Sequence, residues 1–126
     1  MTEIYWEGLL KEHGKKLKGL LSAYIGDRNR GTIIAHFNPA HLNKEALALH
    51  SSEMLRSLTR LHGITANGYA EPDYFVSNSL GERVMIQSIG NSSWYLAFVT
   101  SAKSDYRKNV GVFKQLLEAC QLTPQI

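Results

Sequence analysis

Five histidines are the side chains of this sequence best suited to bind a metal or to move a proton near neutral pH: His13, His36, His41, His50 and His62. A helical metal clamp needs two histidines four residues apart, and no pair has this spacing. A pair assembled by the fold is the alternative. We predict no metal site and no cofactor, and interpret the histidines as exposed or partly packed imidazoles. His50 and His62 would titrate near neutrality if they lie in an interface.

Carboxylates that meet in a pocket would permit general acid–base catalysis. The candidates are Glu71 and Asp73, on either side of Pro72, and Asp27 in a turn. All three stand at polar positions that we expect to be solvated. Cys120 lies at an apolar position of a helical pattern, which favours a packed core thiol over a reactive one. With no phosphate-binding glycine motif and no nucleophile elbow, we predict no catalytic residue and no enzyme.

The composition is typical of one globular domain. The chain has 126 residues, of which 44% are hydrophobic and 20% charged. Because domains usually hold about 100–200 residues, we predict a single domain over residues 1–126 with its core at about 4–122. A lone cysteine excludes an internal disulfide framework. No apolar run approaches the roughly 18 residues of a membrane span, and the acidic, aromatic N-terminus is no secretory signal, so we expect a cytoplasmic protein that is not transmembrane.

The net charge of +3 is concentrated in one segment. Residues 11–30 hold six Lys or Arg and two acidic residues, so the other 106 residues sum to −1. A nucleic-acid-binding protein usually has a larger excess, with exposed aromatic side chains, so we predict no nucleic-acid partner. The segment supplies a candidate docking patch for an acidic partner or a membrane face, which we expect near one end of a sheet: Lys15, Lys16, Lys18, Arg28 and Arg30. A merely solvated face is the alternative.

Hydrophobic periodicity and turn residues predict three helices and five strands to position these groups. We expect helices at residues 6–13, 43–62 and 105–121, and strands at 20–25, 32–37, 74–78, 83–89 and 94–100. The order α-β-β-α-β-β-β-α predicts an α+β fold: a five-stranded antiparallel sheet with the middle helix on one face and the terminal helices on the other. Strand 94–100 is apolar on both sides, which predicts a central position. Gly111, inside the last helix, predicts a close approach of that helix to the sheet.

The middle helix is apolar in more than one direction. One stripe at heptad-like spacing consists of Leu47, Met54, Leu58 and Leu61, while further apolar residues point elsewhere: Leu42, Ala46, Leu49 and Leu55. A helix that only covers a sheet needs one stripe. The second stripe therefore predicts a second partner.

Three stretches carry a resemblance to a known family. They are residues 18–35 (KGLLSAYIGDRNRGTIIA), the long helix with the three strands after it, and residues 109–117 (NVGVFKQLL). Their order and spacing resemble the roadblock family, whose domain occurs in dynein light chains, Ragulator scaffold subunits and prokaryotic partners of small Ras-like GTPases. The resemblance covers roughly residues 4–122. The turn at 27–31 is longer and more basic than the family's usual Asp-x-Gly form.

The resemblance implies a profilin-like domain that works without catalysis. Such a domain forms a homodimer, or a heterodimer with a paralogous chain, and binds a small Ras-like GTPase whose nucleotide cycle or location it changes. Its middle helices pack together and its edge strands pair, which implies interface residues Leu47, Met54, Leu58 and Leu61 on the helix and Tyr74, Val76 and Asn78 on the edge strand. Two alternatives remain: a sensory module with a small ligand between helix and sheet, and a light-chain-type adaptor without a GTPase partner.

Overall fold

Three helices and an antiparallel sheet make up the α+β architecture that the sequence predicts. The computed structural model describes residues 3–65, 75–78 and 81–122, with side chains over 4–57 and 81–122. Its elements are α1 (Glu3–Gly14), β1 (Leu20–Asp27), β2 (Thr32–Phe37), α2 (Lys44–Thr65), β3 (Phe75–Asn78), β4 (Glu82–Ser88), β5 (Trp94–Ser101) and α3 (Tyr106–Leu122). The middle helix thus continues past its predicted end, through Gly63.

The strands lie in the order β2-β1-β5-β4-β3, and every neighbouring pair is antiparallel. β5 therefore occupies the middle of the sheet, as its two apolar sides predict. β1 runs two residues further than predicted, to Asp27, which pairs with Thr32 of β2 and with Trp94 of β5. The turn of the first hairpin is correspondingly shorter, and Gly31 closes it with a φ of 66°. Such a positive φ is favourable for glycine because it has no Cβ.

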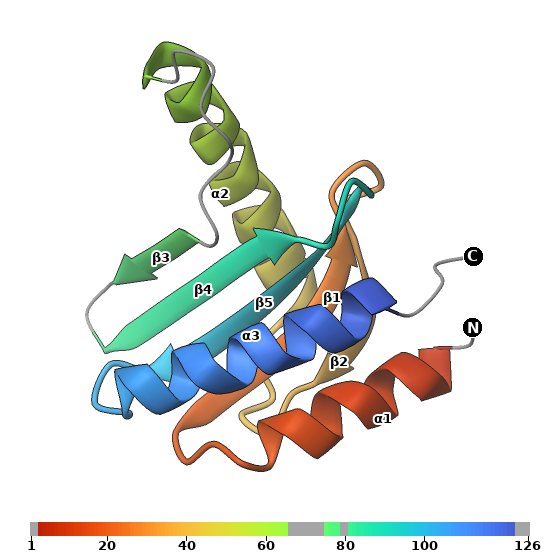
Figure 1. The fold of residues 1–126 in the computed structure, drawn as a ribbon, viewed down its shortest axis with the longest axis vertical. Helices are drawn as coiled ribbons and strands as arrows, with labels where there is room; N and C mark the ends of the chain where they lie inside the picture. The colour runs from red at the N-terminus through yellow and green to blue at the C-terminus, as the bar shows by residue number, and fades with distance from the viewer. Residues whose placement is uncertain (1–2, 66–74, 79–80, 123–126) are drawn as a thin grey trace.

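One face of the sheet is covered by the two terminal helices, as Figure 1 shows. The apolar core on this face joins Trp6 and Leu10 of α1 and Phe113 of α3 to Leu96 and Phe98 of β5. The rings of Phe98 and Phe113 meet edge to face at 5.1 Å. The end of α1 also packs closely against β2. Gly14 makes this possible because it has no side chain, and a Cβ there would lie 2.8 Å from the ring of Phe37.

The opposite face is covered by α2 alone, and this division of the helices confirms the prediction. Met54 and Leu55 of α2 pack in a second cluster with side chains of β1, β4 and β5, among them Tyr24, Ile86 and Tyr95. The second half of α2 then leaves the sheet and projects beyond it (Figure 1). None of the helices, over the residues that the structure describes, has the length and apolarity to cross a membrane.

For the last helix, the prediction about Gly111 is wrong and the prediction about Cys120 is confirmed. Gly111 is exposed, and a Cβ added to it would meet nothing within 4 Å, so it makes no close approach to the sheet. The buried polar residue of this segment is Asn109, whose side-chain amide donates to Ser104 Oγ at 2.7 Å. Cys120 is fully buried, and burial raises the pKa of its thiol to about 12, which confirms a core thiol.

Candidate functional site

The side of α2 that meets the sheet carries half of the stripe predicted for a dimer interface. Met54 is only 8% exposed and Leu47 is half-buried, and both pack in the cluster between α2 and the sheet. This finding corrects the prediction for these two residues, which face their own sheet rather than a second subunit. The heptad-like spacing identifies residues on one side of the helix. It does not show whether that side or the other apolar side packs against the sheet. The side chains of Leu58 and Leu61 lie outside the described residues.

A buried group of hydroxyls fixes α2 on the sheet. Ser51 is 0% exposed, and its hydroxyl lies 2.5 Å from the phenol oxygen of Tyr24. Tyr95 also hydrogen-bonds to Ser51, and the two tyrosine rings meet edge to face at 6.1 Å. Burial raises the pKa of Tyr24 and of Tyr95, although the bond to Ser51 acts in the opposite direction. A buried polar contact of this kind orients the helix because any other placement would leave hydroxyls without partners.

The outer side of α2 presents a stripe of exposed residues that no other described part of the chain covers. Its exposed members at spacings of three and four residues, which we call the outer stripe, are Ala46, Leu49, Glu53 and Arg56. Leu49 is 63% exposed, which is unusual for a leucine in the middle of a long helix. The apolar direction left over for a partner is therefore the one through Leu49.

The strand predicted to pair across a dimer lies at one edge of the sheet. β3 pairs only with β4, with Val76 opposite Met85 and Asn78 opposite Arg83. Its other side is a free edge over the four described residues, and such an edge is available for pairing with another strand. The predicted interface residue Tyr74 lies outside the described residues.

The five cations predicted to form one docking patch do not lie together. Lys15, Lys16 and Lys18 precede β1, whereas Arg28 and Arg30 follow it, so the eight residues of that strand separate the two groups. They lie at opposite ends of the sheet (Figure 1). The prediction of one cluster near one end is therefore wrong. Closeness in sequence was misleading because a strand carries the chain across the whole sheet.

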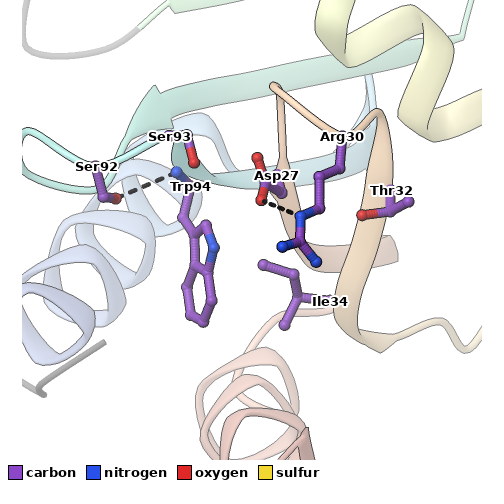
Figure 2. A pocket seen from close by; sticks show the side chains of 7 residues that line it. All are labelled: Asp27, Arg30, Thr32, Ile34, Ser92, Ser93 and Trp94. Carbon is purple, nitrogen blue, oxygen red and sulfur yellow. Dashed lines mark hydrogen bonds and ion pairs between the residues drawn. The ribbon is translucent and has the colours of Figure 1, made fainter. Parts of the chain in front are cut away.

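The end of the sheet beyond β1 contains a pocket that the sequence did not indicate. Its volume is about 520 Å³, and its walls are Asp27, Arg30, Thr32, Ile34, Ser92, Ser93 and Trp94. Figure 2 shows the indole of Trp94 on one side and the side chains of Arg30 and Ile34 on the other. The antiparallel pairing of Asp27 with Trp94 brings the two hairpin turns together here. We call this cavity the hairpin-end pocket.

Asp27 is held inside the hairpin-end pocket rather than in solvent. Its side chain is only 13% exposed, which corrects the expectation of a solvated turn residue. One carboxylate oxygen accepts from the backbone N–H of Asn29 at 2.9 Å, and the other lies 3.9 Å from Arg30 Nε. An aromatic wall, a planar cation and three hydroxyls can bind a flat polar molecule or side chain. The pocket has no second carboxylate in its walls for acid–base work.

Two of the five histidines meet in a second cleft, between α1 and β2. His36 and His41 line this space of about 490 Å³ together with Glu7 and Lys11. The Nδ1 atom of His36 is buried without a hydrogen-bond partner, and His50 is exposed on α2. Within the described ranges, no three His, Cys, Asp or Glu side chains are grouped as metal ligands.

Solved structures of other proteins share this fold. The roadblock/LC7 domain from Streptomyces avermitilis superposes with a TM-score of 0.75 at 16% identity, over 90% of this chain and 92% of that one. MglB from Myxococcus xanthus gives 0.77 at 10% identity, over 94% and 86% of the two chains. The gliding protein MglB from Thermus thermophilus gives 0.75 at 17% identity, over 94% and 87%. No protein-family model and no curated protein matches the sequence. The resemblance to the roadblock family is thus confirmed in the fold.

Proposed function

We propose that this chain, whose fold is that of the roadblock/LC7 domain, is a non-catalytic dimeric regulator of a small Ras-like GTPase. The observation that carries the proposal is the outer stripe of α2 on this fold. A roadblock-type helix with an exposed leucine on its outer side has the apolar surface that a partner helix needs. The choice of a small GTPase as the partner rests on the resemblance to the roadblock family. The described residues include no set of catalytic side chains that would favour an enzyme.

The dimer would join two copies of the outer stripe across a two-fold axis. Such an interface is self-complementary, because each residue meets the same surface of the partner. Ala46 and Leu49 would form its apolar centre, while Glu53 and Arg56 would bring opposite charges to it. The free edges of the two β3 strands would extend one sheet into the other. This arrangement keeps the predicted edge strand and replaces Leu47 and Met54 by the outer stripe.

Light scattering tests the dimer directly. The unchanged protein should run as a dimer at micromolar concentration, and Leu49→Asp should run as a monomer because the interface would bury an unpaired charge. Leu122→Asp is the matched control, since Leu122 is also exposed, at 79%, on a different helix. Equal effects of the two variants, or a monomeric parent protein, would refute the proposed interface.

Binding to a GTPase needs a separate test. The immobilised protein should retain a small Ras-like GTPase of its own organism, with a preference for either the GDP-bound or the GTP-bound form. A dimer that orders or shields the switch loops of the GTPase would have this preference. Negligible retention of every candidate in both states would remove the GTPase and leave the light-chain-type adaptor. We place this activity in the cytoplasm.

A small-ligand module is the second candidate, and the hairpin-end pocket is the observation that favours it. Among the described residues, two apolar clusters pack between the helices and the sheet, so the described pocket with polar walls lies instead at the end of the sheet. The hairpin-end pocket has the size of an ordinary ligand site and an aromatic wall. Screening of small molecules by thermal shift, with Trp94→Ala as the control, separates this candidate from the regulator.

A further inference from the structure

The end of the molecule opposite the hairpin-end pocket collects basic side chains from two parts of the chain. The connector between α1 and β1 carries Lys15, Lys16 and Lys18, and the turn and first residues of α3 carry Lys103, Arg107 and Lys108. All six side chains are exposed, and we call them the basic end. Figure 1 shows that the connector and the start of α3 lie at the same end of the sheet. Only the fold brings them together, since about 85 residues separate the two groups in the sequence.

Contacts between the two loops hold the basic end in one arrangement. The carbonyl oxygen of Gly19 accepts from the N–H of Ser101 at 2.8 Å, and a Cβ on Gly19 would lie 3.0 Å from the Cβ of Ser104. Ser104 in turn donates to the carbonyl oxygen of Ser101 and accepts from the buried amide of Asn109. The lysines therefore project from backbone that is already fixed, so little ordering of the backbone would accompany binding.

The formal charge of the whole protein is located at this end. The adjoining residues add three carboxylates, Glu12, Glu82 and Asp105, and two further cations, Lys11 and Arg83, so eight cations against three carboxylates leave an excess of +5. The complete chain has a net charge of +3, so the remaining residues sum to −2. No ion pair joins the six cations to carboxylates of the described residues. The N-terminus of α3 adds the positive end of its helix dipole to the same surface.

We propose that the basic end docks the protein on an anionic lipid membrane surface. Five of the six cations are lysines, which are depleted at protein–protein interfaces, whereas aromatic residues and arginine are enriched there. Among the exposed large hydrophobic side chains of the described residues, Tyr106 alone lies at this end, so an apolar interface centre is missing. A rigid cluster of lysines without such a centre fits a diffuse layer of phosphate and carboxylate groups, as on a membrane rich in phosphatidylserine. This inference goes beyond the GTPase proposal and does not depend on it.

Sedimentation with lipid vesicles tests the docking. The protein should bind vesicles of phosphatidylserine and phosphatidylcholine in equal amounts at low salt, and should not bind vesicles of phosphatidylcholine alone. Replacement of Lys15, Lys16 and Lys18 by Gln should weaken binding by about tenfold or more, given the usual contribution of each cation near such a surface. Replacement of Lys103, Arg107 and Lys108 by Gln should have the same effect, because the two groups form one surface.

The control removes the same charge from the other end of the molecule. Arg28, Arg30 and Lys44 are all exposed and lie near the first hairpin turn, and their change to Gln should leave vesicle binding within about twofold of the parent protein. Equal losses in the control and the two test variants would show a response to net charge only and would overturn the proposal. So would failure of the parent protein to bind the anionic vesicles, or tighter binding to duplex DNA than to vesicles through the same lysines. Circular dichroism establishes that each variant is folded.

Discussion

The two faces of the sheet are closed in different ways. The face under α1 and α3 is apolar, with edge-to-face contacts between Trp6 and Trp94 and between Phe98 and Phe113. The face under α2 has fewer apolar partners and a hydroxyl group, Ser51, bonded between sheet tyrosines. Two helices share the first face, whereas one helix covers the second and continues beyond it.

The two faces have different roles: one mainly stabilises the fold, and the other sets the orientation of α2. Apolar contacts have no required direction, so the larger apolar cluster under α1 and α3 stabilises the fold without fixing either helix at one rotation. Hydrogen bonds from Ser51 are directional and hold α2 at one rotation about its axis. That rotation turns Leu49 outward. The polar contact on one side of α2 therefore determines which residues its other side offers to a partner.

The largest effect is expected from a truncation on the apolar face. Phe113 is 1% exposed and lies against Phe98. Phe113→Ala should lower the free energy of unfolding by about 3–5 kcal/mol, because it loses buried area and leaves a cavity. Denaturant unfolding measures this value. A loss below about 1 kcal/mol would mean that the two faces do not differ in the way described.

The next largest loss of stability is expected from a substitution at Gly26, which lies against the ring of Tyr95. A Cβ on Gly26 would lie 2.3 Å from the phenol oxygen of Tyr95, so the ring must leave its present position in the tyrosine pair. Gly26→Ala should destabilise the protein by about 1–3 kcal/mol through this overpacking. The shift of Tyr95 should also appear in its ring resonances by NMR. Unperturbed resonances together with unchanged stability would show that α2 does not depend on the position of this ring.

Adjacent serines of α2 allow a sharper test of the hydroxyl group. Ser51→Ala leaves the buried phenol of Tyr24 without its partner and should cost about 1–3 kcal/mol. Ser52 is the matched control, because its Oγ is buried with no hydrogen-bond partner. Ser52→Ala should be neutral or slightly stabilising, since no bond is lost. Equal losses in thermal unfolding for the two variants would contradict the role of Ser51.

The sequence was sufficient to predict the order of the elements and the division of the helices. Apolar residues on both sides of strand 94–100 placed β5 at the centre, and the packing of Leu96 and Tyr95 in different clusters confirms it. The prediction works because successive side chains of a strand point to opposite faces of the sheet, so a strand that is apolar on both sides must be covered on both.

The candidate sites were harder to predict because they depend on which residues meet. Leu47 and Leu49 are equally apolar, and the contacts of α2 with the sheet decide that Leu49 is the exposed one: the packing of Met54 and Leu55 and the hydrogen bond of Ser51. Lys18 and Lys103 form one surface through the contact of Gly19 with Ser101. Asp27 and Trp94 share a pocket because β1 and β5 pair in one register. These contacts cannot be predicted from composition or from spacing along the chain.

The smallest expected effect concerns Gly111, in the helix that covers the apolar face. Its position is exposed, and an added Cβ would touch nothing, so only helix propensity acts there. Gly111→Ala should therefore stabilise the protein by about 0.5–1 kcal/mol, which raises the midpoint of thermal unfolding by a few degrees. The opposite sign is expected if Gly111 must approach another chain closely, as at an interface. A loss of self-association or partner binding in this otherwise stabilised variant would extend the binding surface from α2 to α3, and unchanged binding would leave it on the outer stripe of α2.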